Sequence, residues 1–158
     1  MKRLVKLSLL SCLFLHSSLL AQNDSIRLYC PLNEAVVVPP PKNAMKFDIP
    51  DLCVVLTSLP DTIVKACTVS RVTNVTRNED DGGKWEVVIF SKYKNKEYYF
   101  WYTGLDTVLI KRNEVLKVGQ PIGFIKPGGK IELLMYDFET QVDPTNYLDC
   151  KGVLKNVD

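Results

Sequence analysis

The sequence predicts an all-β fold, either a small sandwich or a barrel, and three observations support this prediction. From Ile26 onward, short runs rich in Val, Ile, Tyr, Phe and Trp alternate with clusters of turn residues, a pattern typical of β-sandwiches and barrels. No segment shows the hydrophobic period of a long helix. The length of 158 residues suits one domain with a single core.

Polar turns separate the expected strands. Segments 78–83 and 92–96 are two such turns, and the second predicts a hairpin with Asn95 near its tip. The Lys-Pro-Gly-Gly segment 126–129 is another turn. Segment 36–41, Val-Val-Val-Pro-Pro-Pro, should be an edge strand or a loop across the sheet, because proline lacks the N–H that a central strand needs. The clearest strands are residues 62–75, 85–91, 97–102, 107–111, 121–125 and 130–138.

The first 21 residues resemble an export signal in composition. A basic start at residues 1–3 precedes an apolar stretch at 7–15, and the small Ala21 marks the expected cleavage point. We therefore expect residues 1–21 to be removed and the mature protein to be periplasmic or extracellular. The alternative is a lipobox ending at Cys12, which would tether the mature protein to a membrane.

Charge and hydropathy limit the partners of the mature chain. The formal net charge is only +2, and no run of Lys and Arg is long enough to follow a phosphate backbone, so we expect no nucleic-acid partner. After residue 21 no apolar run approaches the roughly 18 residues that span a bilayer. We therefore expect no transmembrane segment in the mature protein.

Four cysteines follow the export signal: Cys30, Cys53, Cys67 and Cys150. An even number in an exported chain favours two disulfides. Four cysteines allow three connectivities, and their spacing does not choose between them. The alternative is buried free thiols, and no pair has the C-x-x-C spacing of a metal or redox site.

The aromatic run at 98–102, Tyr-Tyr-Phe-Trp-Tyr, is the clearest compositional peak. Alternation along a strand sends Tyr99 and Trp101 to one face and Tyr98, Phe100 and Tyr102 to the other. One face should fill the core. The other face either packs as well or is available to a ligand, and flat rings with polar tips suit sugars or peptides.

Three segments, taken in order and spacing, resemble the lysostaphin-type, LytM-like zinc peptidase domain. Residues 60–66, Pro-Asp-Thr-Ile-Val-Lys-Ala, resemble its P-x-G-T-x-V-x-A strand, with Asp61 in place of glycine. Tyr-Thr-Gly-Leu at 102–105 and the segment 113–123 are similar to its Y-x-H-L strand and G-x-x-V-x-x-G-Q-x-I-G turn. Val-Asp-Pro-Thr-Asn-Tyr-Leu at 142–148 resembles the V-D-P-x-x-Y-L ending.

The resemblance implies a small β-sandwich of the barrel-sandwich hybrid type, with a groove floored by an antiparallel sheet. It implies a peptidase-like domain over residues 44–150, an N-terminal extension over 22–43 lying across it, and a C-terminal tail over 151–158. It also favours one pairing of the cysteines. That pairing is Cys53 with Cys67 and Cys30 with Cys150.

Members of this family bind zinc through the His and Asp of H-x-x-x-D and the second His of H-x-H. The first His of H-x-H and the His of Y-x-H-L assist proton transfer. In this sequence Asp48 matches the aspartate, but Ala44 stands at the first histidine and Gly104 at the Y-x-H-L histidine. Glu132 and Leu134 stand at the expected H-x-H positions. The zinc-binding motif is therefore degenerate.

The chain has one histidine, His16, and it lies within the export signal. A hydrolytic zinc site normally takes three protein ligands, mostly imidazoles, and a Ser or Cys nucleophile usually needs an imidazole base. We therefore expect no catalytic residue, no metal and no cofactor. A site rebuilt from Asp48, Glu132 and a thiol is an alternative, although carboxylates favour Ca or Mg. Another alternative is glycosidase chemistry by a pair of carboxylates, for which the candidates are Asp48, Glu132, Asp137 and Glu139.

The expected function is that of a non-catalytic, peptidase-like protein of the cell envelope. Its degenerate groove, with Trp101, Tyr102 and Tyr136 along it, would bind peptidoglycan or an envelope protein. Family members that have lost their zinc ligands activate cell-wall amidases, so the resemblance implies an amidase as a possible partner. One alternative is an active metalloendopeptidase with atypical ligands. Another is a structural or adhesion module whose groove is filled by Leu134 and Met135. The sequence does not indicate the oligomeric state.

Overall fold

The structure is a computed structural model that describes residues 26–38 and 52–150. Its regular structure consists of strands and one short 3₁₀ helix, η1 (Pro144–Asn146), so the expected all-β class is confirmed. The described part of the chain contains no helix with the length and apolar character needed to cross a bilayer. Residues 1–21, which were expected to form an export signal, lie outside the described residues, as do Ala44 and Asp48.

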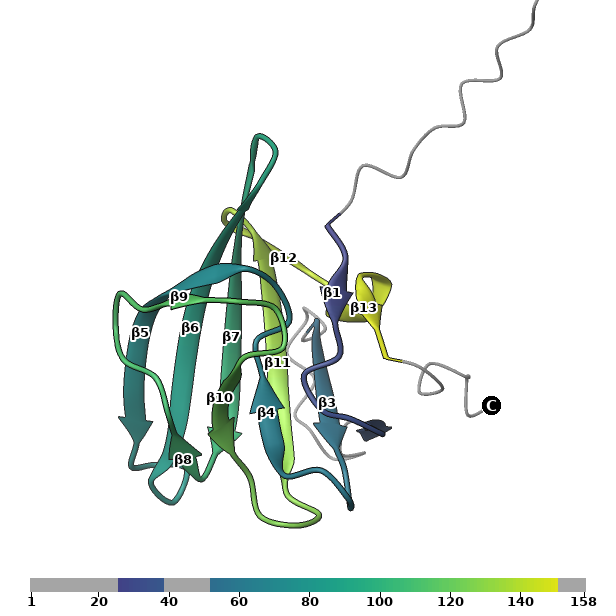
Figure 1. Cartoon of the computed structure of the whole chain (residues 1–158), viewed down its shortest axis with the longest axis vertical. Helices are drawn as coiled ribbons and strands as arrows, with labels where there is room; N and C mark the ends of the chain where they lie inside the picture. The colour runs from purple at the N-terminus through teal and green to yellow at the C-terminus, as the bar shows by residue number, and fades with distance from the viewer. Residues whose placement is uncertain (1–25, 39–51, 151–158) are drawn as a thin grey trace, which may run out of the picture.

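An eight-stranded sheet forms the larger layer of the molecule (Figure 1). Every strand pair in it is antiparallel. In spatial order its strands are β2 (Val36–Val38), β3 (Cys53–Thr57), β11 (Lys130–Asp137), β7 (Lys96–Leu105), β6 (Lys84–Tyr93), β5 (Ser70–Asn78) and β9 (Val115–Leu116), and β12 (Thr140–Val142) pairs with β11. Segment 36–38 therefore forms an edge strand, as expected. The turn at Lys94 and Asn95 joins β6 to β7 as the expected hairpin.

Two smaller sheets cover one face of this layer. The first has the order β4 (Ile63–Lys65), β10 (Pro121–Phe124) and β8 (Thr107–Val108), and the second is a parallel pair of β1 (Leu28–Tyr29) and β13 (Leu148–Asp149). Figure 1 shows β4, β10 and β8 in front of the large sheet. The core lies between the layers, where Val64 and Ile122 of the small sheet and Phe100 and Leu133 of the large sheet are fully buried. The sandwich architecture is therefore confirmed.

The expected single strand at 62–75 is wrong, because it is two strands in different sheets. β4 belongs to the small sheet and β5 to the large sheet. The residues between them cross the core, where the Ala66 N–H donates to Gln120 O at 2.9 Å and the Cys67 N–H donates to the Tyr102 hydroxyl at 3.0 Å. High β-propensity continues across this crossing, so propensity alone does not locate it. The expected strand at 107–111 is also too long, since β8 ends at Val108.

One expected disulfide is present and the other is not. Cys30 and Cys150 are bonded, with their Cα atoms 4.7 Å apart. The expected pairing of Cys53 with Cys67 is wrong, because Cys67 is a completely buried thiol in the core. On β3 the core-facing residues are Val54 and Leu56, so alternation directs Cys53 to the opposite face of the sheet. Burial raises the pKa of the Cys67 thiol to about 12.

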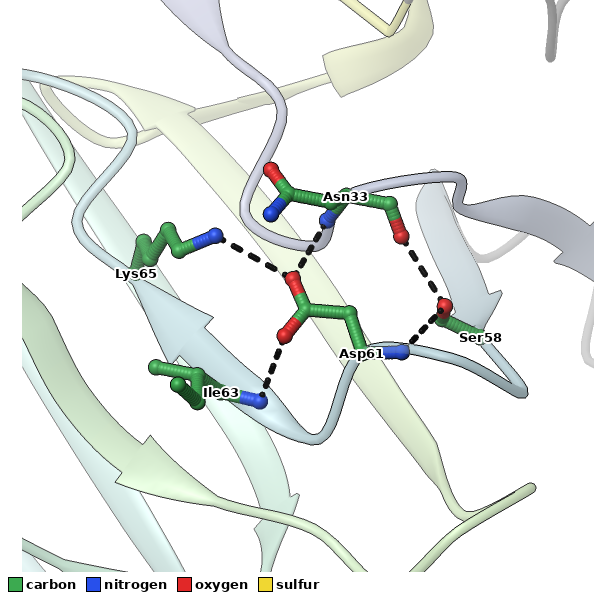
Figure 2. Close-up of polar contacts among 5 residues, drawn as sticks. All are labelled: Asn33, Ser58, Asp61, Ile63 and Lys65. Carbon is green, nitrogen blue, oxygen red and sulfur yellow. Dashed lines mark hydrogen bonds and ion pairs between the residues drawn. The ribbon is translucent and has the colours of Figure 1, made fainter.

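Asp61, which replaces the glycine of the resembled motif, fastens the N-terminal segment to the sandwich (Figure 2). Its Oδ2 accepts hydrogen bonds from the Asn33 N–H at 2.8 Å and from Lys65 Nζ at 3.1 Å, and its Oδ1 accepts from the Ile63 N–H at 3.0 Å. The Ser58 hydroxyl donates to Asn33 O at 2.9 Å and accepts from the Asp61 N–H at 3.1 Å. Burial raises the pKa of Asp61, but these hydrogen bonds and Lys65 outweigh it and hold the pKa below its ordinary value.

Candidate functional site

The face of the large sheet that points away from the smaller sheets is called the outer face here, and it carries Trp101, Leu134 and Tyr136. On β11, Ile131, Leu133 and Met135 are buried in the core. The intervening Glu132, Leu134 and Tyr136 are half-buried and therefore point to the opposite side. The structure thus brings Glu132, Leu134 and Tyr136 onto one face.

β7 shows the alternation predicted for the aromatic run. Tyr98, Phe100 and Tyr102 are buried, whereas Tyr99 is half-buried and Trp101 is 38% exposed. The prediction that Tyr102 lines the groove is wrong. Its ring is completely buried, its hydroxyl accepts the hydrogen bond from the Cys67 N–H, and burial raises its pKa well above the ordinary value. Tyr102 therefore belongs to the core, on the side opposite Trp101.

Strand register arranges the outer face in rows, because directly paired residues of neighbouring strands share a face. Trp101 pairs with Val88 on β6 and with Leu134 on β11. Leu134 pairs in turn with Cys53 on β3, and Asn74 on β5 pairs with Val88. This central row is mainly apolar across five strands.

A second row is aromatic and lies beside the central row. Tyr99 pairs with Phe90 on one side and with Tyr136 on the other. The ring centroids of Phe90 and Tyr99 are 5.2 Å apart, and the rings are tilted by 51°, a geometry that aromatic pairs favour. Arg71 pairs with Phe90 at one end of this row, and Gln141 pairs with Tyr136 at the other end.

Two acidic side chains, Glu86 and Glu132, also lie on the outer face, and Glu86 orients Trp101. The indole Nε1–H of Trp101 donates to Glu86 Oε2 at 3.2 Å, and Asn78 Nδ2 donates to Glu86 Oε1 at 2.7 Å. Glu132 Oε2 accepts from the Thr103 hydroxyl at 3.3 Å. The two carboxylates therefore bind neighbouring side chains of the sheet and not one another.

Gly104 has a backbone conformation and a close contact that disfavour any other residue. Its φ is +86°, in the region that favours glycine. A Cβ placed on it would lie 2.7 Å from Lys130 O, a backbone atom that cannot swing away. The pairing of β6 with β7 also shifts between Trp85 and Val87, next to this residue. The position that matches the Y-x-H-L histidine is thus a backbone irregularity that excludes a side chain.

The described residues do not fit a zinc site of the resembled kind. Of the positions matched to metal ligands or catalytic histidines, Gly104 offers no side chain, Leu134 is apolar, and Glu132 is hydrogen-bonded to Thr103. Within residues 26–38 and 52–150, no three His, Cys, Asp or Glu side chains are grouped so that they could hold a metal ion. The described residues therefore do not supply the ligands that zinc-dependent hydrolysis needs.

Sequence reasoning missed several members of the outer face. Val88 and Phe90 were placed on a strand but not on a face. The sequence alone does not assign these faces, because residues 87–90 are an unbroken apolar run; only the structure shows that Val87 and Ile89 are buried and that Val88 and Phe90 are half-buried. The role of Glu86 depends on a contact with Trp101 on a neighbouring strand, and no local pattern reveals it.

Comparison with known proteins identifies the fold. No protein-family profile matches the chain, and no curated protein sequence does. Csd3 of Helicobacter pylori is similar in structure, with a TM-score of 0.58 and 16% identity, over 78% of this chain and 33% of that chain. The catalytic domain of a mutant of EnpA, a prophage-encoded M23 protein from Enterococcus faecalis, gives a TM-score of 0.55 and 16% identity over 72% and 91%.

Two further solved structures extend this similarity. A chain of the SpoIIQ–SpoIIIAH pore-forming complex has a TM-score of 0.55 and 14% identity, over 78% of this chain and 92% of that one. Lysostaphin has a TM-score of 0.56 and 17% identity, over 72% of this chain and 49% of that one. The chain therefore spans about a third of Csd3 and about half of lysostaphin. At these identities the similarity concerns the fold alone: the chain has the LytM-like fold of the lysostaphin-type peptidase domains.

Proposed function

We propose that this protein is a non-catalytic module of the cell envelope that binds peptidoglycan or an envelope protein through its outer face. The observation that carries the proposal is the outer face itself. Leu134 and Glu132 stand at the expected H-x-H positions, and Trp101 and Tyr136 lie on the same face. Within residues 26–38 and 52–150, this face therefore has the groups of a binding surface, and no cluster of side chains there could hold a metal ion.

The argument against catalysis rests on chemistry and on backbone geometry. Residues 22–158 contain no histidine, and imidazole supplies most ligands of hydrolytic zinc. Gly104 cannot be replaced by histidine without moving either its own backbone or that of Lys130. A single reverting substitution would therefore not rebuild the site.

The outer face is suited to an extended, amphipathic ligand. Its apolar and aromatic rows lie side by side across several strands and end in polar groups such as Arg71, Asn74 and Gln141. Aromatic side chains bury a large area while losing little conformational entropy, and Trp and Tyr keep a polar group for hydrogen bonding. Peptide stems and glycan chains of peptidoglycan have this mixed character, as do extended segments of proteins.

The cysteines support a location outside the cytoplasm. The Cys30–Cys150 disulfide would persist in an oxidising compartment and is unusual in the cytosol. Together with the export signal in residues 1–21, it favours a periplasmic or extracellular protein. A cell-wall amidase is one envelope partner that would link this module to cell-wall hydrolysis.

A co-sedimentation experiment on purified peptidoglycan tests the proposal. The protein should sediment with peptidoglycan, and Trp101→Ala should weaken its retention at least about fivefold, because loss of a central aromatic contact costs about 1 kcal/mol or more. Phe138→Ala is the matched control. Phe138 is also an exposed aromatic residue, 59% accessible, but it lies in the turn between β11 and β12.

The outcomes separate the candidate functions. Retention that is lost in Trp101→Ala and kept in Phe138→Ala supports binding at the outer face. Equal retention of both variants would contradict it. If the wild-type protein does not sediment, the peptidoglycan arm is wrong, and a purified amidase becomes the next ligand for the same pair of variants.

A structural module with a filled groove is less well supported. In that alternative Leu134 and Met135 would fill the groove, but Met135 is completely buried in the core. Leu134 lies on the outer face and is half-buried. One of the two proposed filling residues therefore belongs to the opposite side of the sheet.

A further inference from the structure

A concave site lies away from the outer face, beside the disulfide that joins the two ends of the described chain. This hollow, named the clasp pocket here, has a volume of about 590 Å³, within the range of small-ligand sites. It is bounded by the segment 29–35, by Lys65 of β4, by Gly119, and by Asp149 and Cys150. None of these residues belongs to the rows of the outer face.

The charges around the clasp pocket favour a cation. Glu34 and Asp149 line it and are exposed, and within the described chain no ion pair joins either carboxylate to a basic residue. Lys65 is the basic side chain of the lining, and its Nζ is 3.1 Å from Asp61 Oδ2. Because Asp61 neutralises Lys65, the two remaining carboxylates set a negative potential in the pocket.

The rest of the lining is apolar and suits an aliphatic stem. Leu32 and Ala35 are buried beneath the hollow, and the disulfide forms part of its wall. Tyr29 also lines the hollow and is 58% exposed, and an aromatic ring beside a cation attracts it more strongly as water is excluded. Carboxylates beside an apolar wall are complementary to a positive charge carried on a hydrocarbon chain.

The pocket is held in shape before any ligand arrives. Glu34 has a φ of 47°, a left-handed conformation that is uncommon outside glycine. The turn that carries it is fixed from the preceding residue, because the Asn33 N–H donates to Asp61 and Asn33 O accepts from Ser58 (Figure 2). The disulfide ties the start of this segment, at Cys30, to Cys150. A preorganised site loses less entropy on binding.

We propose that the clasp pocket binds a primary ammonium group on an aliphatic stem, as in a lysine-type side chain of a peptide. The stem packs against the disulfide and Tyr29, and the ammonium group lies between Glu34 and Asp149. This site is independent of the outer face, so its test does not depend on the function proposed for that face.

An NMR titration of the full chain with its disulfide intact tests the inference. The probe is Nα-acetyl-lysine methylamide, and the matched control is the same compound with its side-chain amine acetylated. The amine probe should bind with about millimolar affinity, as expected for a ligand of its size, and shift the amide signals of Tyr29, Cys30, residues 32–35, Lys65 and Cys150. The acetylated control should not shift them.

Substitutions locate the charge recognition. Glu34→Gln and Asp149→Asn should each weaken binding about threefold, and the double variant about tenfold. Glu139→Gln is the control, since Glu139 is an exposed carboxylate in the turn between β11 and β12, and it should leave binding unchanged. Lys65→Gln should keep or strengthen binding, because it removes the positive charge from the lining.

Three results would overturn the inference. The first is equal shifts of the amide signals with the amine probe and the acetylated probe. The second is undiminished binding of the amine probe by the double variant of Glu34 and Asp149. The third is loss of that binding in Lys65→Gln together with amide shifts caused by acetate. The last result would mean that the pocket takes an anion. The amide spectrum of each variant reports its folding in the same experiment, so a misfolded variant is recognised directly.

Discussion

Replacing Gly104 with alanine tests the conclusion that this position excludes a side chain. Two costs are expected. A left-handed φ of +86° costs a non-glycine residue about 1–2 kcal/mol. The added Cβ would also lie 2.7 Å from Lys130 O, and relieving such an overlap in a packed region costs about 1–3 kcal/mol. The free energy of unfolding should therefore fall by about 2–5 kcal/mol.

Gly119 provides the matched control for this measurement. Its φ of +74° is similar, but nothing lies within 4 Å of a Cβ placed on it. Gly119→Ala should therefore show the conformational cost alone, about 1–2 kcal/mol. Urea unfolding followed by tryptophan fluorescence and circular dichroism gives both values, and unchanged m-values would show that the denatured states are comparable.

The difference between the two variants is the decisive quantity. A Gly104→Ala variant that is at least about 1 kcal/mol less stable than Gly119→Ala confirms the steric exclusion. If the two variants were equally stable, the backbone at Lys130 would be able to move and accommodate a side chain at position 104. The position could then hold a histidine, and the backbone argument against a rebuilt site would fail.

Three further predictions concern the other parts of the fold. Replacing Cys30 and Cys150 together with serine should lower the free energy of unfolding by up to about 5 kcal/mol, because the bond closes a loop with a sequence separation of 120; an unchanged urea midpoint would show that the bond does not restrict the denatured chain. The pKa of Asp61 is lowered in the folded state, so its contribution to stability is present above the ordinary value of 3.8 and is lost as the pH falls through the folded pKa. Asp61→Asn should lower the free energy of unfolding by about 1–3 kcal/mol at pH 7 and make its dependence on pH flatter below about pH 4. Parallel pH profiles for the wild-type and variant proteins would contradict this. The Cys67 thiol is fully buried with a pKa of about 12, so at pH 8 it should react with iodoacetamide in urea and not in the native protein; rapid native labelling at Cys67, located by mass spectrometry, would refute its burial.

The faces of the long strands could be predicted from the sequence because alternation is a local property. Tyr98 and Phe100 are buried while Tyr99 and Trp101 lie on the outer face, as the period of two requires. The pattern did not show that Tyr102, on the buried side, was unavailable to a ligand. The resembled motif brings Tyr102 close to Gly104 in sequence, but alternation along the strand decides its face and directs it to the core.

Features that depend on pairing between distant strands could not be predicted. Cys53 faces away from the core because of its place on β3, a strand that the sequence pattern did not single out. The break between β4 and β5 separates two sheets within one continuous β-prone segment. Gly104 carried a partial signal, since glycine within a strand often marks a bulge, but its contact with Lys130 O required the fold.

The clasp pocket depends on contacts that no local pattern reveals. The Asn33–Asp61 hydrogen bond joins residues separated by 28 positions, and the disulfide joins residues separated by 120. In the sequence, Asp61 was visible only as a departure from a glycine of the resembled motif. The structure gives the departure a physical reason, because the carboxylate accepts hydrogen bonds from the N-terminal segment, Ile63 and Lys65.

Incubation of the purified protein with zinc and peptidoglycan tests the central claim most directly. The metal retained after desalting is measured beside the amino groups released from the peptidoglycan. A non-catalytic protein should retain well below one zinc ion per chain and release no new amino groups. Stoichiometric zinc, accompanied by release of amino groups that stops when the metal is removed by chelation, would contradict it.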